Sequence, residues 1–434
     1  MQQKIQETTN DIHEDMPRKG GNFLNQLFQH LFYTHIILIA AVTIFLTLRG
    51  AISPTRTHHL HPKKWYLIIL SSTALSGISG FSWQEFTGLN PLKTFKTTFW
   101  LSPLLTCAFG VVLVLIGTPA SLAASVFALI SSILQSLYAC WATPRFEHAA
   151  KILTLSLTCP PPKVRATIIL SLVTSILYSS LSMSGIGGTA TTTTGTKLDI
   201  LFIFLILGSF AWTMQIIKNT IQVAVSHFKY MQLTCGIEVD LKTVIKDAVR
   251  YSIGSICTGS ILVPVITVIR ALARAVSLVS GDSDEFMFSC AGCCSGVGSR
   301  IVSYGNRWGF VHVGVYSKGI VRASMDTWEM FTTIGIEELI NCDLTSSFCF
   351  LSGVAEGAVC GLVGGIWALF LQKGYATEVC IYAFLIGYFM NRVAMAWVQA
   401  SVMAYYVAYA ENPQSQQFDS TIPAYMRELQ RSQV

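Results

Sequence analysis

Charged side chains are scarce in this chain of 434 residues. Aspartate, glutamate, lysine and arginine make up 12% of it, while 52% of its residues are hydrophobic. An ordinary soluble domain has about 25% charged residues, so too few charges are present to cover a water-facing surface of this size. No proline-, glycine- or serine-rich linker divides the chain, although soluble cores split into domains above roughly 250–300 residues. The deficit excludes a single soluble globular protein.

Several functional motifs are absent as well. The chain has no P-loop, no His-Glu-X-X-His and no Gly-X-Ser-X-Gly motif, so no catalytic residue and no cofactor are predicted, and an enzyme is the least supported class. No basic run alternates with aromatic residues as a nucleic-acid surface requires. The formal net charge of +6 instead fits basic loops that face an anionic membrane leaflet.

No disulfide framework or metal site is predicted. The twelve cysteines are scattered and lie mostly in apolar runs, as small hydrophobic residues do. Cys290, Cys293 and Cys294 are close in sequence, but no second cysteine pair or histidine follows at zinc-finger spacing. Plain thiols are the favoured reading, with reversible acylation as the alternative. His58, His59 and His61 are predicted to form an interfacial loop.

What the sequence does contain is a series of long apolar runs. A run of about 20 residues crosses the ~30 Å hydrocarbon layer as a helix. Nine runs stand out, at residues 31–49, 65–82, 99–118, 120–141, 166–185, 198–217, 249–272, 346–371 and 376–408. They predict an all-α polytopic transmembrane helix bundle.

Lysines and arginines in the loops predict the sidedness of the chain. The loop 142–165 has four of them and the segment 273–345 has five, so both are predicted to be cytosolic, whereas the tract 186–197 is predicted to be external. Two runs separate 186–197 from 273–345, so one further pass or half-pass is required, within 218–237 or at 308–315. The alternative for the first of these stretches is that the sixth run continues as far as Met231. The predicted layout is a cytosolic tail (1–30), a transporter domain (31–408, including 273–345) and a cytosolic tail (409–434).

The seventh run contains helix-weakening residues. Gly254, Gly259 and Pro264 lie within eleven residues of one another. Transporters build substrate sites from helices that are broken at membrane depth. The alternative is that the two glycines let neighbouring backbones approach closely, and the sequence favours this second interpretation.

The last two runs each carry one charge near the middle. Glu356 and Arg392 fall at a similar depth if the runs form antiparallel neighbours, since a helix rises ~1.5 Å per residue. An unpaired charge at that depth costs at least ~2.5–3.5 kcal/mol. The sequence therefore predicts an intramembrane ion pair, either a structural bridge or a gate.

Aromatic residues in the second half are candidates for binding a cation. A quaternary ammonium has no hydrogen-bond donor, and aromatic faces hold it with ~0.5–2 kcal/mol each. The candidate walls are Trp212, Tyr251, Trp367 and Trp397. Tryptophan and tyrosine also gather at membrane interfaces without any binding role.

Between the seventh and eighth runs, residues 315–340 have apolar positions at helical spacing, with acidic and basic residues between them. This pattern predicts an amphipathic helix in the interface or beneath the bundle. Residues 145–157 show a weaker pattern of the same kind.

Four stretches resemble the choline transporter-like family of solute carriers, and within it the plant members. They are Tyr251–Ser260 (YSIGSICTGS), Cys290–Cys294 (CAGCC), Val315–Asp326 (VYSKGIVRASMD) and Tyr409–Pro413 (YAENP). The resemblance covers roughly 250–415; upstream, only Trp212 and Asn219 are matched. It implies about ten spans, cytosolic termini, and transport of choline, with ethanolamine as a second candidate. The family usually has a carboxylate about twelve residues before the Ala-Glu pair, and this chain has Gln399 there.

The leading prediction is a facilitator or secondary transporter for choline or a related small organic cation, with no nucleic-acid partner. Its site would be formed by the four aromatic residues with Gly254, Gly259 and Gln399. Membrane lipids are the other expected partner, and the oligomeric state is left open. The plasma membrane is the expected location, with trans-Golgi or endosomal membranes as the alternative. The rival prediction is a non-transporting membrane protein of lipid homeostasis or vesicle trafficking, which Gln399 and the amphipathic segment favour.

Overall fold

The computed structural model describes residues 23–52, 62–192, 197–279, 302–371, 373–415, 418 and 421–432. Within these ranges the regular structure is helical throughout, with no strand. The longer helices are α2 (Phe23–Ile52), α3 (Pro62–Leu89), α4 (Pro91–Ile116), α5 (Pro119–Ala142), α6 (Phe146–Leu157), α7 (Val164–Thr192), α8 (Lys197–Cys235), α9 (Leu241–Tyr251), α10 (Ile253–Val279), α12 (Gly309–Tyr316), α13 (Ile320–Ile334), α15 (Thr345–Leu371), α16 (Ala376–Ala394), α17 (Ala396–Glu411) and α18 (Thr421–Ser432), and α14 (Glu337–Asn341) is a single short turn.

Eight of the described helices are long and apolar enough to cross a membrane, or nine when the bent pair α16–α17 counts as one span. Their outward surfaces are apolar: Leu104, Phe127 and Phe204 are each more than 60% exposed. Small polar side chains such as Thr98 and Thr106 are buried instead, and they donate to the carbonyl four residues earlier. Lipid rather than water suits such a surface, so the predicted all-α polytopic bundle is confirmed.

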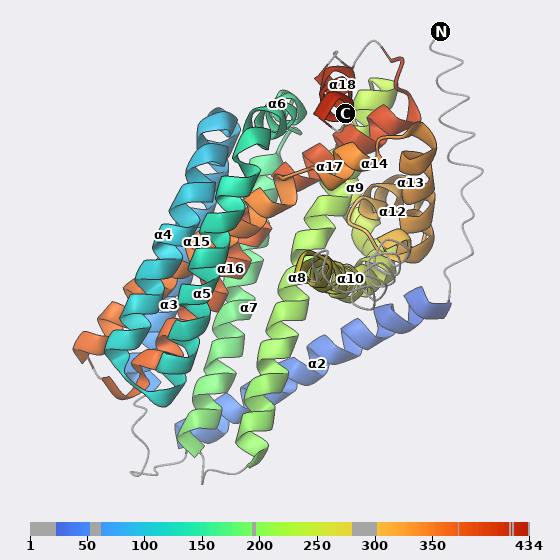
Figure 1. Cartoon of the computed structure of the whole chain (residues 1–434). Coiled ribbons are helices and arrows are strands. Elements are labelled where there is room, and N and C mark those ends of the chain that lie inside the picture. Colours follow the sequence, from blue (N-terminus) through green and yellow to red (C-terminus); the bar gives the residue numbers. More distant parts are fainter. Residues whose placement is uncertain are drawn as a thin grey trace. The chain divides into compact units, whose positions relative to one another are not determined.

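The chain folds into two compact units, labelled by helix in Figure 1. The first unit comprises the chain up to Tyr33, Gln222–Gly335 and Met403–Ser415. The second unit comprises Thr34–Ile221, Ile336–Val402 and Gln416–Val434.

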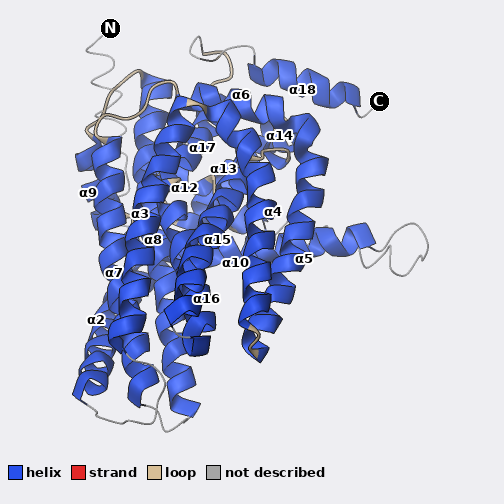
Figure 2. Cartoon of the chain, turned by 90° about the vertical axis from the view of Figure 1, so that its left-hand side faces the viewer, coloured by secondary structure: helices blue, strands red, loops and turns tan. Residues whose placement is uncertain are grey.

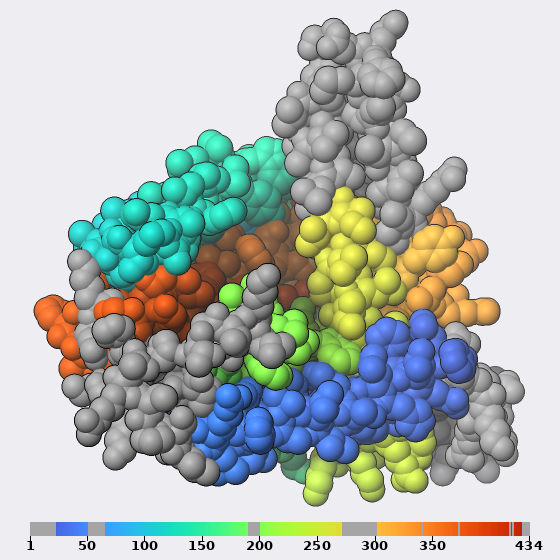
Figure 3. Space-filling model, turned by 90° about the horizontal axis from the view of Figure 1, so that it is seen from below, coloured from blue at the N-terminus to red at the C-terminus, as the bar shows by residue number. Residues whose placement is uncertain are grey.

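In the second unit, α15 packs against α16, α4 and α3, and α4 pairs with α5. Figure 2 shows these long helices side by side, with α6 and α18 together at one end. The α4–α5 turn is set by its sequence: Gly117 ends α4 with φ +75°. Thr118 and Ser121 then form a capping box around the first turn of α5, which begins with Pro119. The Thr118 hydroxyl lies 2.8 Å from that of Thr377, so the start of α5, teal in Figure 3, lies beside the orange α15–α16 turn.

The first unit contains the end of α8, the helices α9, α10, α12 and α13, and the end of α17. Glycines allow close packing within it. A Cβ on Gly309 would lie 2.6 Å from the Ser324 hydroxyl, and one on Gly314 would lie 2.7 Å from the Val223 carbonyl oxygen. Thus α12 lies between α13 and α8.

Several helix boundaries differ from those predicted. The first helix begins at Phe23 rather than near residue 31, and α17 continues to Glu411. Residues 218–235 continue α8, so the extra pass predicted within 218–237 is wrong. The predicted single run 376–408 is two helices, α16 and α17, bent by 43°. The bend lies at Met395, which caps α16 and whose amide donates to the Asn391 and Val393 carbonyls.

The amphipathic segment predicted at 315–340 is also divided. α12 ends where Ser317 takes a left-handed conformation (φ 50°), and α13 ends at Gly335 (φ 77°). Of the apolar positions that carried this prediction in α13, Trp328 and Phe331 are buried, Val321 and Ile334 are half-buried, and Met325 is 44% exposed. Helices α12 and α13 have 8 and 15 residues, fewer than the ~20 that span a bilayer. The second predicted amphipathic segment, 145–157, corresponds to α6.

Candidate functional site

Polar side chains line the contact between α3 and α15 in the second unit. The Ser79 hydroxyl donates to the Glu356 carboxylate. One turn further along α3, the Trp83 indole N–H donates to the Ser352 hydroxyl at 3.4 Å. The two helices therefore run antiparallel with a polar seam between them. Glu356 is only 9% exposed, and an ionisable group inside a spanning helix is expensive and usually functional.

Arg392 on α16 faces the same part of α15. Its side-chain methylenes lie 3.1 Å from the position of a Cβ on Gly353, one turn from Glu356. Among the described residues, the Glu356 carboxylate contacts Ser79 and, at 3.5 Å, the Cys360 thiol. The Nη1 atom of Arg392 is buried without a partner. The predicted ion pair is therefore not closed in this conformation, and it stays a prediction.

A stripe of four glycines brings α15 close to its neighbours, a feature that the sequence analysis missed. Gly353, Gly357, Gly361 and Gly365 recur every fourth residue and so share one helix face. A Cβ on Gly357 would lie 2.7 Å from the Phe384 carbonyl oxygen, and one on Gly365 would lie 2.7 Å from the Cys380 Sγ. Repeated small residues at this spacing are the sequence signal for close helix packing in membranes.

The first turns of α17 add two of the predicted residues to the polar interior. The Trp397 indole N–H donates to the Gln84 Oε1 at 2.5 Å. The Gln399 Nε2 donates to the Ser346 hydroxyl at 2.9 Å, while its Oε1 is buried without a partner. The side-chain amide of Asn391 is also buried without a partner at either atom. Buried amides of this kind are normally satisfied, so this interior is suited to hold a polar group.

The other predicted aromatic walls have different surroundings. In the second unit, the Trp212 ring lies 4.9 Å from that of His35, and Trp367 is 39% exposed on α15. Tyr251 belongs to the first unit and is 65% exposed. The structure thus brings Trp397 into the polar interior, and it does not bring Trp212 and Trp367 together there.

The two glycines of the seventh run serve close packing. α10 is continuous from Ile253 to Val279 and includes Pro264, so it is not broken at the glycines. A Cβ on Gly254 would collide with the Asn25 carbonyl oxygen, and one on Gly259 would lie 2.8 Å from the Phe310 ring. The interruption lies two residues before Gly254, at Ser252, which caps the end of α9.

The first unit contains a second polar cluster, centred on the partly exposed carboxylate of Glu411 at the end of α17, with buried Tyr230 and His312 beside it. The Tyr230 hydroxyl donates to this carboxylate, and the His312 Nε2 lies 3.2 Å from it. The Tyr316 hydroxyl lies 2.9 Å from that of Tyr230, and the Thr327 hydroxyl lies 3.1 Å from the His312 Nδ1. Burial raises the pKa of Tyr316, so its phenol keeps its proton. Through Glu411 the cluster joins α8, α12, α13 and α17.

Replacing Glu411 by glutamine is expected to lower the melting temperature of the purified protein by about 2–5 °C, because an amide cannot accept from all the surrounding donors and leaves a buried group unsatisfied. Differential scanning fluorimetry in detergent measures the shift. Glu329→Gln, on an exposed position of α13, makes the same chemical change and should leave the temperature within about 1 °C of wild type. Equal melting temperatures for the two variants would show that the cluster does not stabilise the fold.

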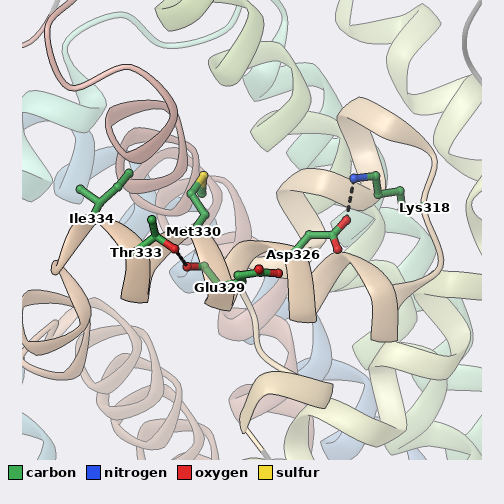
Figure 4. A pocket seen from close by; sticks show the side chains of 6 residues that line it. All are labelled: Lys318, Asp326, Glu329, Met330, Thr333 and Ile334. Carbon is green, nitrogen blue, oxygen red and sulfur yellow. Dashed lines mark hydrogen bonds and ion pairs between the residues drawn. The ribbon is translucent and has the colours of Figure 1, made fainter.

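A pocket of about 360 Å³ lies along α13 in the first unit. Figure 4 shows its lining, with the Lys318 ammonium 2.6 Å from the Asp326 carboxylate and the Thr333 hydroxyl donating to the Glu329 carbonyl at 2.8 Å. Met330 and Ile334 supply apolar surface. Lys318 neutralises the Asp326 carboxylate, so the pocket is lined by both polar and apolar side chains without a strong charge of one sign.

No group of three or more histidine, cysteine or acidic side chains within the described residues could hold a metal ion. The cysteines at 290, 293 and 294 and the histidines at 58, 59 and 61 lie outside these residues.

Comparison with known proteins identifies relatives. The sequence profile of the plasma-membrane choline transporter family matches residues 126–414. Protein PNS1 of Gibberella zeae is 29% identical over 179 residues, which are 39% of this chain and 33% of that protein. Protein PNS1 of Mycosarcoma maydis is 29% identical over 178 residues (38% and 34%), and that of Cryptococcus neoformans is 26% identical over 230 residues (49% and 42%). The chain therefore covers a third to about two-fifths of the length of these relatives.

Proposed function

The chain belongs to the plasma-membrane choline transporter family, and from this premise we propose that it carries choline or a related small organic cation across a membrane. The family match supports the transporter class. The relatives' names specify no substrate, so the cation rests on the chemistry of the site.

The observation that carries the proposal is the buried carboxylate of Glu356 within a spanning helix. Its contacts among the described residues are a hydroxyl and a thiol, so its negative charge is not neutralised by a neighbouring cation. Two aromatic rings lie one turn from Glu356 along α15. The Trp83 indole is hydrogen-bonded to Ser352, and the Tyr388 ring lies 3.1 Å from the Cβ position of Gly353. A carboxylate between aromatic faces is the recognition chemistry of a quaternary ammonium.

Arg392 supplies a means of gating in this proposal. Its Cδ lies 3.1 Å from the Cβ position of Gly353, one turn before Glu356, so in this proposal a change of side-chain rotamer closes the predicted ion pair. A closed pair would occupy the carboxylate when no substrate is bound, and the substrate cation would replace the guanidinium. Alternating access by movement of helix groups is the general mechanism of such carriers.

The proposed location is the plasma membrane, with trans-Golgi or endosomal membranes as the alternative. A second candidate function, a non-transporting role in lipid homeostasis or vesicle trafficking, is favoured by one observation. Gln399 uses its amide to hold Ser346, which is a structural contact, and it adds no negative charge to the interior.

Uptake of labelled choline into proteoliposomes tests the proposal, with empty vesicles as background. We expect saturable uptake by the wild-type protein. The variant Gln399→Glu should bind choline about tenfold more tightly, because an added carboxylate at a partly desolvated site contributes roughly 1–2 kcal/mol to the binding of a cation. Gln135→Glu adds the same charge between α4 and α5, where the Ser102 hydroxyl donates to Gln135 at 2.7 Å, and should not raise affinity.

Uptake by Gln399→Glu alone would indicate a carrier scaffold that has lost choline as a substrate. No uptake by either folded protein would overturn the transport proposal in favour of the second candidate.

A further inference from the structure

Helix α9 lies at a membrane surface, as follows from its place in the chain. It begins at Leu241, six residues after α8 ends at Cys235, and only Ser252 separates it from α10. Both α8 and α10 are candidate spans. A helix of 11 residues between two spans is too short to cross the bilayer itself. It must therefore lie where the hydrocarbon layer meets water.

The exposed face of α9 carries a row of positive charges. Lys242, Lys246 and Arg250 are spaced by four residues, so they follow one another along the helix, and all three are exposed. The opposite face, with Leu241, Val244 and Ala248, is buried in the first unit. The helix thus turns its basic side outward.

Among the described residues, none of these three charges has an acidic partner within 4.0 Å. The ion pairs of the described residues involve other side chains. Asp247 is the one acidic residue of the helix, and Glu238 and Asp240 precede it. Val249 and Tyr251 are exposed beside the row, and the Tyr251 ring lies 5.4 Å from the Arg250 guanidinium. A basic row beside an exposed aromatic ring is typical of a helix in the headgroup region.

The chain order gives the side of the membrane. Two spans, α7 and α8, separate the loop 142–165 from α9, so both lie on the same side. That loop is the basic one predicted to be cytosolic, and the cytosolic leaflet carries the anionic phospholipids. Because α10 is one further span, the same count places α12 and α13 on the opposite side, and this topology is incompatible with the prediction that 273–345 is cytosolic.

We propose that the row formed by Lys242, Lys246 and Arg250 binds the headgroups of anionic phospholipids of the adjacent leaflet. This surface is separate from the Glu356 site and does not depend on the proposed transport activity. The bound lipids fix the junction between α8 and α10 at the interface.

Binding of fluorescent phosphatidylserine to the purified full-length protein in detergent tests this proposal, with phosphatidylcholine of the same acyl chains as the uncharged comparison. Each basic residue near an anionic surface contributes about 1 kcal/mol, or about fivefold in affinity. We expect preference for phosphatidylserine in the wild type and at least about a tenfold loss in the triple variant Lys242→Gln, Lys246→Gln, Arg250→Gln. Binding should also weaken as salt is raised.

A matched variant, Lys93→Gln, Lys96→Gln, Lys151→Gln, removes three exposed lysines of α4 and α6 and should keep the preference. Lys242→Arg with Lys246→Arg should bind like wild type, which separates lost charge from misfolding. Equal binding of the two lipids, equal loss in the matched variant, or full displacement of the lipid by inorganic phosphate would each overturn the proposal.

Discussion

Replacing Gly357 by leucine is expected to abolish the monodisperse protein in detergent. A Cβ at this position would lie 2.7 Å from the Phe384 carbonyl oxygen, which is backbone and cannot rotate away as a side chain could. Accommodating leucine requires separation of α15 from α16, and forced overpacking costs about 1–3 kcal/mol or more. Gel filtration of the solubilised protein measures the loss.

Gly208→Leu is the control for this prediction. Gly208 also lies within a spanning helix, α8, but it is exposed and nothing lies within 4 Å of its Cβ position. It should give a gel-filtration peak like that of wild type. If Gly357→Leu behaves as this control does, the close α15–α16 contact does not hold the second unit together.

Replacing Glu356 by glutamine is expected to reduce choline uptake about 100-fold while the protein still folds. Glutamine keeps the size and can still accept from the Ser79 hydroxyl, but it removes the charge that would meet the cation. Loss of one buried ionic partner costs about 3 kcal/mol or more, which corresponds to about 100-fold in affinity. Initial rates over a range of choline concentrations measure the change.

Glu85→Gln serves as the matched variant, because it removes a carboxylate from α3 whose ion-pair partner, Arg165, is 70% exposed. The glutamine keeps an oxygen that can accept from the Gln84 amide, as Glu85 does at 2.8 Å. Exposed pairs contribute little, so this variant should transport like wild type. Equal uptake by Glu356→Gln and wild type would exclude Glu356 as the cation site.

The exchange of Glu356→Arg with Arg392→Glu tests the gate. Recovery of uptake above that of either single change would support a pair that closes during transport. If the exchange does not restore uptake while both single variants are folded and inactive, the ion pair is excluded, and Glu356 remains the residue that binds the cation.

The apolar runs and the scarcity of charged residues determined the class of the protein. A helix in lipid must satisfy its own backbone hydrogen bonds, so run length alone predicts a span, and eight helices of the required length are present. The charged residues Glu356 and Arg392 were found for the same reason, because a charge inside an apolar run is conspicuous. The glycine stripe of α15 could have been predicted from its four-residue spacing.

Only the tertiary structure decided which of these residues meet. Helix breaks at Ser252 and Met395 have no proline or glycine at the break, so local sequence gives no signal for them. The partners of Glu356 and Glu411 come from helices far away in sequence, as Ser79 and Tyr230 do. Periodicity specifies which face of a helix is buried, but the neighbour against that face depends on the packing of all the helices together.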